Sequence, residues 1–222
     1  MSNEHSGLPV EFDGRVRLFP LPNHVVFPHT VQSLHIFESR YCEMLLDAMA
    51  SDELIAMATL QPNYEYDYFA RPPIHPVVCL GHVIGHEPRR NETHDLLLAG
   101  LCRARIEEEL PPMLSYREAR VELLKDTSPP ESSAVTRLRE PLIQHLQKLT
   151  GSDVESSVAL PLDELPLCVM TDVLAHHLPL ATNVKLGLLE ETNVISRAEL
   201  IATALPPRRR RHSSGDPPYS LN

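Results

Sequence analysis

The sequence has few glycines and few aromatic residues, and it has no tryptophan at all. Its 222 residues include 8 glycines against 21 prolines, and 5% of them are aromatic. Loops that cradle phosphate groups need closely spaced glycines, and neither G-x-x-x-x-G-K-[ST] nor G-x-G-x-x-G occurs in the chain. A P-loop and a dinucleotide-binding turn are therefore excluded, and the many prolines predict fixed turns. We expect no cofactor.

The chain also lacks long apolar runs and paired cysteines. No stretch of about 18 apolar residues occurs, so no membrane span is expected, and the polar N-terminus does not resemble a signal peptide. The cysteines stand singly, without the C-x-x-C pair that would suggest a zinc site. The prediction is therefore reduced, buried thiols in a cytoplasmic protein. The four positions are Cys42, Cys79, Cys102 and Cys168.

Acidic residues outnumber basic ones over most of the chain. The formal net charge is -10, and four arginines at residues 208–211 contribute +4, so the rest of the chain carries -14. An acidic body makes nucleic-acid binding unlikely, because such binding uses a basic face. We expect residues 1–14 to form a flexible arm and residues 206–222 a disordered basic and polar tail. Contact of the arginines with an acidic partner or with RNA is left open.

Signals for strand, turn and helix follow one another in residues 16–49. Pro20 and Pro28 each fix φ and remove an amide donor, which favours extended segments joined by turns. Residues 31–36 alternate between two faces, as a strand does. Apolar residues then recur at three- and four-residue spacing, which predicts an amphipathic helix over Ser39–Met49.

The start of this predicted helix combines apolar and charged residues. Glu38 and Ser39 are expected to supply the N-terminal cap. Glu38 and Arg40 are also expected to fasten the helix to the strands through hydrogen bonds, in a structural role. The apolar positions assigned to the buried face are Phe37, Tyr41, Met44, Leu45 and Ala48.

Short strand signals continue to residue 124, and helical spacing replaces them afterwards. Residues 15–126 therefore predict a small, mostly β, barrel-like domain that contains one early helix. Residues 127–205 predict a small helical bundle, in which Pro141 kinks or starts a helix. The expected strands, besides residues 31–36, are residues 15–19, 25–27, 54–60, 77–86, 95–99, 102–108 and 116–124.

The segment LFPLPNHVVFPHTVQSLHIFESRY at residues 18–41 resembles the opening of the Lon amino-terminal, or substrate-binding, domain family. Further motifs follow in the family's order, at residues 80–84 (LGHVI) and 100–106 (GLCRARI). Asp172 and Arg197 match two later helical elements. The residues that carry this structural signature are Phe19, Pro20, Pro28, Phe37, Glu38, Arg40, Tyr41, Gly81 and Gly100. The chain departs from the pattern at turns, where His29 replaces a usual glycine.

The resemblance implies an α+β fold: a PUA-like, mostly antiparallel β pseudo-barrel with one early helix, followed by a small C-terminal helical bundle. It implies a non-catalytic module that binds unfolded segments or a partner protein and is linked to protein quality control. In full-length Lon proteases an ATPase and a Ser–Lys protease module follow this domain, and here we expect a stand-alone domain. The alternatives are a peptidase-associated hydrolase and a small-ligand binder with its pocket in the barrel. A homo-oligomer is left open.

An aromatic cluster is the candidate contact surface of this module. Tyr64, Tyr66, Tyr68 and Phe69 fall within six positions of a long connection. Tyrosine supplies a large amphipathic contact area at low entropic cost, which suits a protein-binding surface. The alternative is that the rings fold onto the body of the protein in an ordinary loop or strand.

Histidines and glutamates offer little chemistry at their spacings. On a strand, His82 and His86 would lie on one face about 13 Å apart, too far to share a metal ion. His75 or His94 could supply a further ligand from a neighbouring strand, but no metal site is expected. The run of glutamates at residues 107–109 is interpreted as a solvated strand end, so no catalytic residue is assigned.

Overall fold

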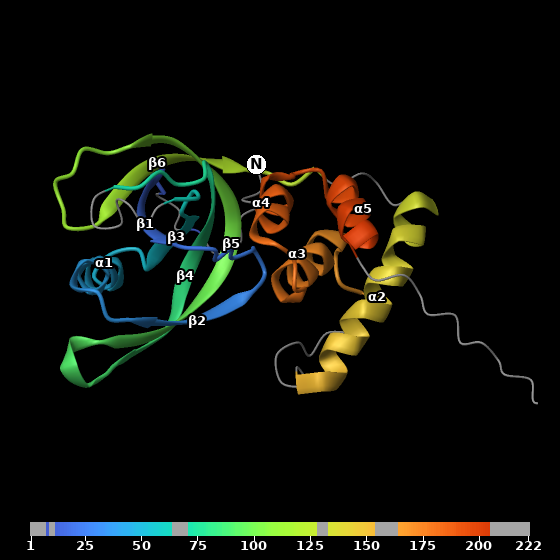
Figure 1. The fold of residues 1–222 in the computed structure, drawn as a ribbon, viewed down its shortest axis with the longest axis horizontal. Coiled ribbons are helices and arrows are strands. Elements are labelled where there is room, and N and C mark those ends of the chain that lie inside the picture. The colour runs from blue at the N-terminus through green and yellow to red at the C-terminus, as the bar shows by residue number, and fades with distance from the viewer. Residues whose placement is uncertain (1–7, 9–11, 64–70, 128–132, 154–163, 205–222) are drawn as a thin grey trace, which may run out of the picture.

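The computed structural model describes residues 8, 12–63, 71–127, 133–153 and 164–204. Strands and helix α1 form one side of the molecule, and helices α2 to α5 form the other (Figure 1). Among the described residues, no helix is both long and apolar enough to span a membrane. The elements in chain order are β1 (Arg15–Leu21), β2 (Val31–Ile36), α1 (Ser39–Met49), β3 (Leu54–Thr59), β4 (Val77–Pro88), η2 (Arg90–Glu92), β5 (His94–Glu109), β6 (Arg117–Leu124), α2 (Ser133–Asp153), α3 (Leu167–His177), α4 (Thr182–Glu190) and α5 (Val194–Ala204).

The six strands form one mixed sheet in the order β2-β5-β4-β3-β1-β6, and a further pairing joins β5 to β6. Strand β5 is 16 residues long, which lets it pair with β2 through its first half and with β6 through its second half. This double pairing closes the sheet into a barrel. Among the paired strands of the described residues, β1 and β3 are the two that run parallel to each other. The predicted α+β fold, with a β-rich barrel followed by helices, is confirmed.

Strand β3 is buried on both faces, which explains its continuous apolar sequence. Leu54, Ala56 and Ala58 join a cluster made mostly of strand residues. Ile55 and Met57 join a larger cluster that also contains the buried side of α1 and residues from α2 to α5. A strand covered on both faces does not alternate between apolar and polar residues. The larger cluster packs the barrel and the C-terminal helices against each other.

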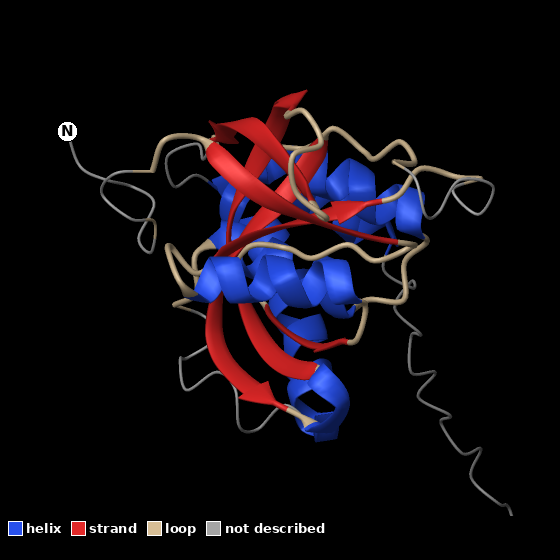
Figure 2. Cartoon of the chain, turned by 90° about the vertical axis from the view of Figure 1, so that its left-hand side faces the viewer, coloured by secondary structure: helices blue, strands red, loops and turns tan. Residues whose placement is uncertain are grey.

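Helix α1 has the predicted bounds and buries Tyr41, Met44, Leu45 and Ala48. The predicted capping is wrong, because Glu38 occupies the cap position but its side chain makes no capping hydrogen bond. Figure 2, which looks onto the left-hand side of Figure 1, shows α1 lying across the front of the sheet.

Gly100 does not break the strand, contrary to the prediction of two strands at residues 95–99 and 102–108. The segment 25–30 crosses directly over it: His29 N donates to Gly100 O (2.9 Å), and Gly100 N donates to Thr30 O (2.8 Å). A Cβ at Gly100 would lie 2.1 Å from the Phe27 carbonyl oxygen, so the position needs glycine for close approach.

The crossing segment itself differs from the prediction of a strand at residues 25–27. These residues are buried but form no strand. His29, which the resemblance identifies as a replacement for glycine, has a left-handed backbone with φ of 62°. The turn therefore retains the conformation that glycine favours although the residue has a side chain.

A buried network of charges joins the barrel to the helices. Arg103 on β5 donates from Nε to Leu189 O (2.9 Å) and from Nη1 to Asp172 Oδ2 on α3 (3.2 Å). Arg197 on α5 donates from Nη1 to Asp126 Oδ1 (3.1 Å), and its Nε lies 3.5 Å from Asp172 Oδ1. Arg103, Asp172 and Arg197 are almost completely buried. Buried charges remain charged only when each is paired, so the four side chains form one structural unit.

Candidate functional site

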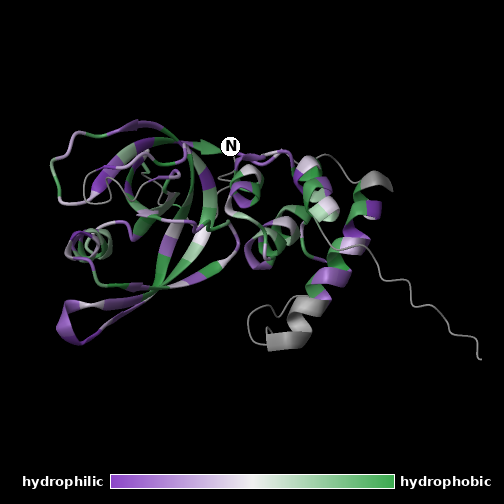
Figure 3. Cartoon of the chain, in the orientation of Figure 1, coloured by the Kyte–Doolittle hydropathy of each residue, from purple (hydrophilic) through white to green (hydrophobic). Residues whose placement is uncertain are grey.

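The hairpin of β4 and β5 extends past the rest of the sheet and ends beside α1 (Figure 1). At its tip Asn91 and Glu92 have φ of 63° and 58°, as the two central residues of a type I′ turn do. Arg89 N donates to Thr93 O (2.8 Å) and closes the turn. The tip is mainly hydrophilic (Figure 3). It therefore projects into solvent and forms one wall of the space next to α1.

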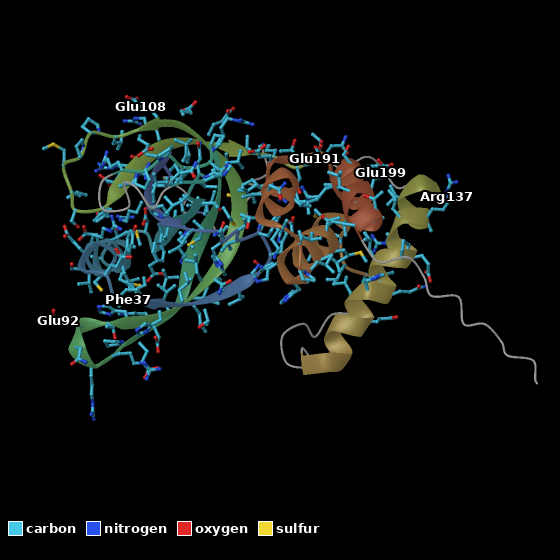
Figure 4. The ribbon with its side chains drawn as sticks, viewed as in Figure 1. Phe37, Glu92, Glu108, Arg137, Glu191 and Glu199 are labelled. Carbon is cyan, nitrogen blue, oxygen red and sulfur yellow. The ribbon has the colours of Figure 1, made fainter. Side chains whose placement is uncertain are left out.

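An open groove of about 640 Å³ lies between α1 and this hairpin tip. Figure 4 shows Phe37 next to the hairpin and Glu92 at its tip. The hydrogen bond from Cys42 Sγ to Glu92 O (3.4 Å) connects the two walls at the base of the groove. The lining residues are Phe37, Ser39, Cys42, Glu43, Leu46, Asp47, Pro88, Arg89, Asn91, Glu92 and His94.

Two large apolar side chains in this groove face solvent. Phe37 is 69% exposed and Leu46 is 53% exposed. The prediction that Phe37 packs on the buried face of the helix is wrong, because Phe37 precedes the helix and its ring stacks on His35 instead (centroids 6.3 Å apart). Exposed apolar side chains gathered in a hollow are typical of a surface that binds a ligand.

The groove also contains three carboxylates. Glu43 accepts a hydrogen bond from Ser115 Oγ (2.7 Å), and Asp47 accepts one from the Tyr116 hydroxyl (2.7 Å). Burial and the Asp47 carboxylate raise the pKa of Tyr116 well above its usual value, so this donor stays neutral. Glu92 lies exposed at the hairpin tip. Because the described hydrogen-bond donors to Glu43 and Asp47 are neutral, they cancel none of the negative charge.

Little positive charge opposes these carboxylates. Arg89 is bound to two other acidic side chains, Asp95 and Glu87, at 2.5 and 2.9 Å. Burial and the neighbouring His86 lower the pKa of His94, which favours a neutral imidazole near pH 7. The groove is therefore net negative at neutral pH.

The histidines singled out in the sequence meet in one pair. His86 Nε2 and His94 Nδ1 lie 2.9 Å apart across the two strands of the hairpin. His82 is directed elsewhere, with its Nε2 3.1 Å from Glu53 Oε2. Within the described part of the chain, no three side chains of the metal-binding types come together. The histidine pair alone offers too few ligands for a structural zinc site.

The charged pair at the start of α1 makes local contacts. Arg40 Nη2 lies 2.9 Å from Glu38 Oε2, and the Arg40 guanidinium lies over the Tyr41 ring, 4.6 Å from its centroid. The Tyr41 ring in turn packs against Phe19 of β1, with centroids 4.6 Å apart. This aromatic pair attaches this end of the helix to the barrel.

Tyr64, Tyr66, Tyr68 and Phe69 lie outside the described residues, so their role as a contact surface stays a prediction. Sequence reasoning missed Leu46, Glu43 and Glu92 as site residues. The available signal was Leu46, which is apolar but falls away from the buried side of the helical period.

The barrel, its helical appendage and the open groove define a binding domain of α+β architecture. The chain belongs to the family described as the ATP-dependent protease La (LON) substrate-binding domain, whose model matches residues 15–205. It is 27% identical to the Lon protease of Heliobacterium modesticaldum over 197 residues, which cover 85% of this chain and 23% of that protein. The Lon protease of Brevibacillus choshinensis is 28% identical, with coverage of 85% and 24%. The chain thus spans about a quarter of the length of these relatives.

Solved structures share the fold. A Lon N-terminal domain protein from Xanthomonas campestris superposes with a TM-score of 0.66 at 19% identity, covering 86% of this chain and 99% of that chain. The N-terminal domain of a Mycobacterium avium complex Lon protease gives 0.65 at 14% identity, covering 85% and 96%. At these identities the likeness concerns the fold.

Proposed function

We propose that this protein is a recognition module that binds unfolded segments of other proteins in the groove between α1 and the β4–β5 hairpin. The observation that carries the proposal is the solvent exposure of Phe37 and Leu46 in that groove, in a member of a substrate-binding domain family. Unfolded chains expose apolar side chains that folded proteins bury. An open groove with apolar walls accepts such side chains without selecting one folded partner.

The test replaces the apolar wall. In the Phe37→Ala and Leu46→Ala double variant, we expect the Kd for a labelled, reduced and carboxymethylated protein to rise about five- to thirtyfold. Loss of this contact area removes on the order of 1–2 kcal/mol at about 25 cal/mol per Å². Because both side chains are exposed, the melting temperature should stay nearly unchanged. Fluorescence anisotropy measures the binding, and calorimetry measures the melting.

Leu200→Ala is the matched control, because Leu200 is an equally exposed leucine (50%) on another helix, α5, away from the groove. It should leave binding unchanged. Unchanged binding in the double variant would refute the groove as the contact surface. A parallel variant, Tyr66→Ala with Tyr68→Ala, tests the aromatic cluster that the sequence suggests. If only that variant binds unfolded protein more weakly, the aromatic cluster and not the groove is the binding site.

The proposed role is non-catalytic, and a separate protease or ATPase would act on the bound segment. The match of residues 15–205 to a substrate-binding domain supports this proposal. We also propose a reducing, cytoplasmic compartment, which the four free cysteines support.

A further inference from the structure

We infer that the groove selects segments in which an apolar side chain lies close to a lysine or arginine. The inference rests on the proposed function and adds the chemical class of its ligand. Its basis is the placement of acidic and apolar side chains on the same two walls, namely α1 and the hairpin tip.

Helix α1 sets apolar and acidic groups side by side. Leu46 and Asp47 lie three and four residues after Glu43, so each of them is a neighbour of Glu43 on the helix surface. The distance between Cβ atoms at such positions is about 5–6 Å. In an extended segment, residues i and i+2 point to the same side and lie about 6.6 Å apart. The spacing therefore fits a segment of the form apolar–any–basic.

The opposite wall repeats the negative charge. Glu92 is exposed at the hairpin tip and lines the groove, and the hydrogen bond from Cys42 to its carbonyl oxygen places its backbone beside α1. Burial raises the pKa of the Cys42 thiol, so Cys42 adds no charge that would alter this balance at neutral pH. A basic side chain placed between the walls would be attracted from both sides.

The positive charge already present in the groove is engaged elsewhere. Arg89 carries a bond to Asp95 and another to Glu87, which hold its guanidinium against the hairpin. The three lining carboxylates Glu43, Asp47 and Glu92 therefore keep a surplus of negative charge. This charge complementarity favours cationic segments and disfavours acidic ones, including nucleic acid and an acidic second copy of the same chain.

The test compares two labelled peptides on the intact protein. One contains three Leu-Ser-Lys repeats separated by glycine and serine, and the other replaces each lysine by glutamate. At about 50 mM salt we expect the lysine peptide to bind at least about tenfold more tightly. The difference should fall several-fold at about 300 mM salt, because ions screen attraction at exposed sites. Anisotropy at both salt concentrations gives the Kd values.

The Glu43→Gln and Glu92→Gln double variant should reduce the preference for lysine to about threefold or less while it keeps the shape of the groove. Its control is Glu108→Gln with Glu199→Gln, which removes the same charge from exposed sites on β5 and α5 away from the groove (Figure 4). The control should keep the preference.

Three negative results have different meanings. Equal binding of both peptides that still depends on Phe37 and Leu46 would overturn the charge selection and leave the proposed function standing. If neither the peptides nor unfolded protein bind, the charge selection and the proposed function are both wrong. A preference for lysine that the control variant also removes would show a general charge effect and would overturn selection by the groove.

Discussion

Gly100 shows how one residue fixes the path of a distant segment. Its missing side chain makes room for the Phe27 carbonyl oxygen, and its backbone forms hydrogen bonds with His29 and Thr30. The same segment leads directly into β2 and then to Phe37, so the glycine helps to position the groove. A glycine in a strand often marks such a close backbone approach.

Substitution of this glycine should therefore be costly. In Gly100→Ala the new Cβ meets backbone at 2.1 Å, which the chain can relieve only by moving the segment. We expect a loss of about 2–3 kcal/mol in the free energy of unfolding, typical of overpacking, and a lower Tm. Urea unfolding followed by circular dichroism measures it.

Gly187→Ala is the control for this experiment. Gly187 lies within α4, and a Cβ there would meet nothing within 4 Å. Alanine favours helix over glycine by up to about 1 kcal/mol, so this variant should be neutral or more stable. If Gly100→Ala were as stable as Gly187→Ala, the account of the close approach would be wrong.

At the scale of elements, the sequence predicts what depends on local spacing. Helix α1 begins and ends as predicted, because its apolar period and the polar residues around it are local signals. The continuation of β5 through Gly100 could not be foreseen, because the reason for this glycine is the close approach of the segment that crosses it. The groove could not be foreseen either. Its two walls, α1 and the hairpin tip near Glu92, are far apart in the sequence and come together only in the folded structure.

The charge network between β5, α3 and α5 should decide how firmly these elements stay together. Asp172→Asn would remove the fully buried carboxylate of the network and leave Asp126, which is partly exposed, as the described carboxylate against Arg103 and Arg197. Removing one partner of a buried ion pair costs about 3–5 kcal/mol, so we expect a loss of that order in unfolding free energy. Denaturant titration and limited proteolysis of the helical part measure it.

An exposed ion pair gives the comparison. Glu87→Gln removes one carboxylate from Arg89 at the surface, where solvent and salt screening leave an ion pair little effect on stability. Its stability should match that of the unchanged protein. A loss in Asp172→Asn no larger than in Glu87→Gln would argue against the network as the joint between barrel and helices.

At the scale of the whole molecule, the observations support a substrate-recognition module. One core cluster packs the barrel and the helices together, which makes them a rigid support. The apolar and acidic groups of the groove lie on top of that support, at the surface. Binding sites positioned by a rigid scaffold lose less entropy when a ligand arrives.

The same view predicts that the purified protein does not cleave peptides. A Ser–Lys mechanism needs a lysine with a lowered pKa beside a serine hydroxyl. Burial does lower the pKa of Lys185, but its Nζ donates to the His176 carbonyl oxygen (2.6 Å). Lys125 is exposed on the surface. We expect casein to remain intact over hours with or without ATP, as judged by gel electrophoresis and by release of labelled fragments. Lys185→Met is the decisive variant, because reproducible cleavage that this substitution abolishes would identify a catalytic lysine and replace recognition with hydrolysis as the function.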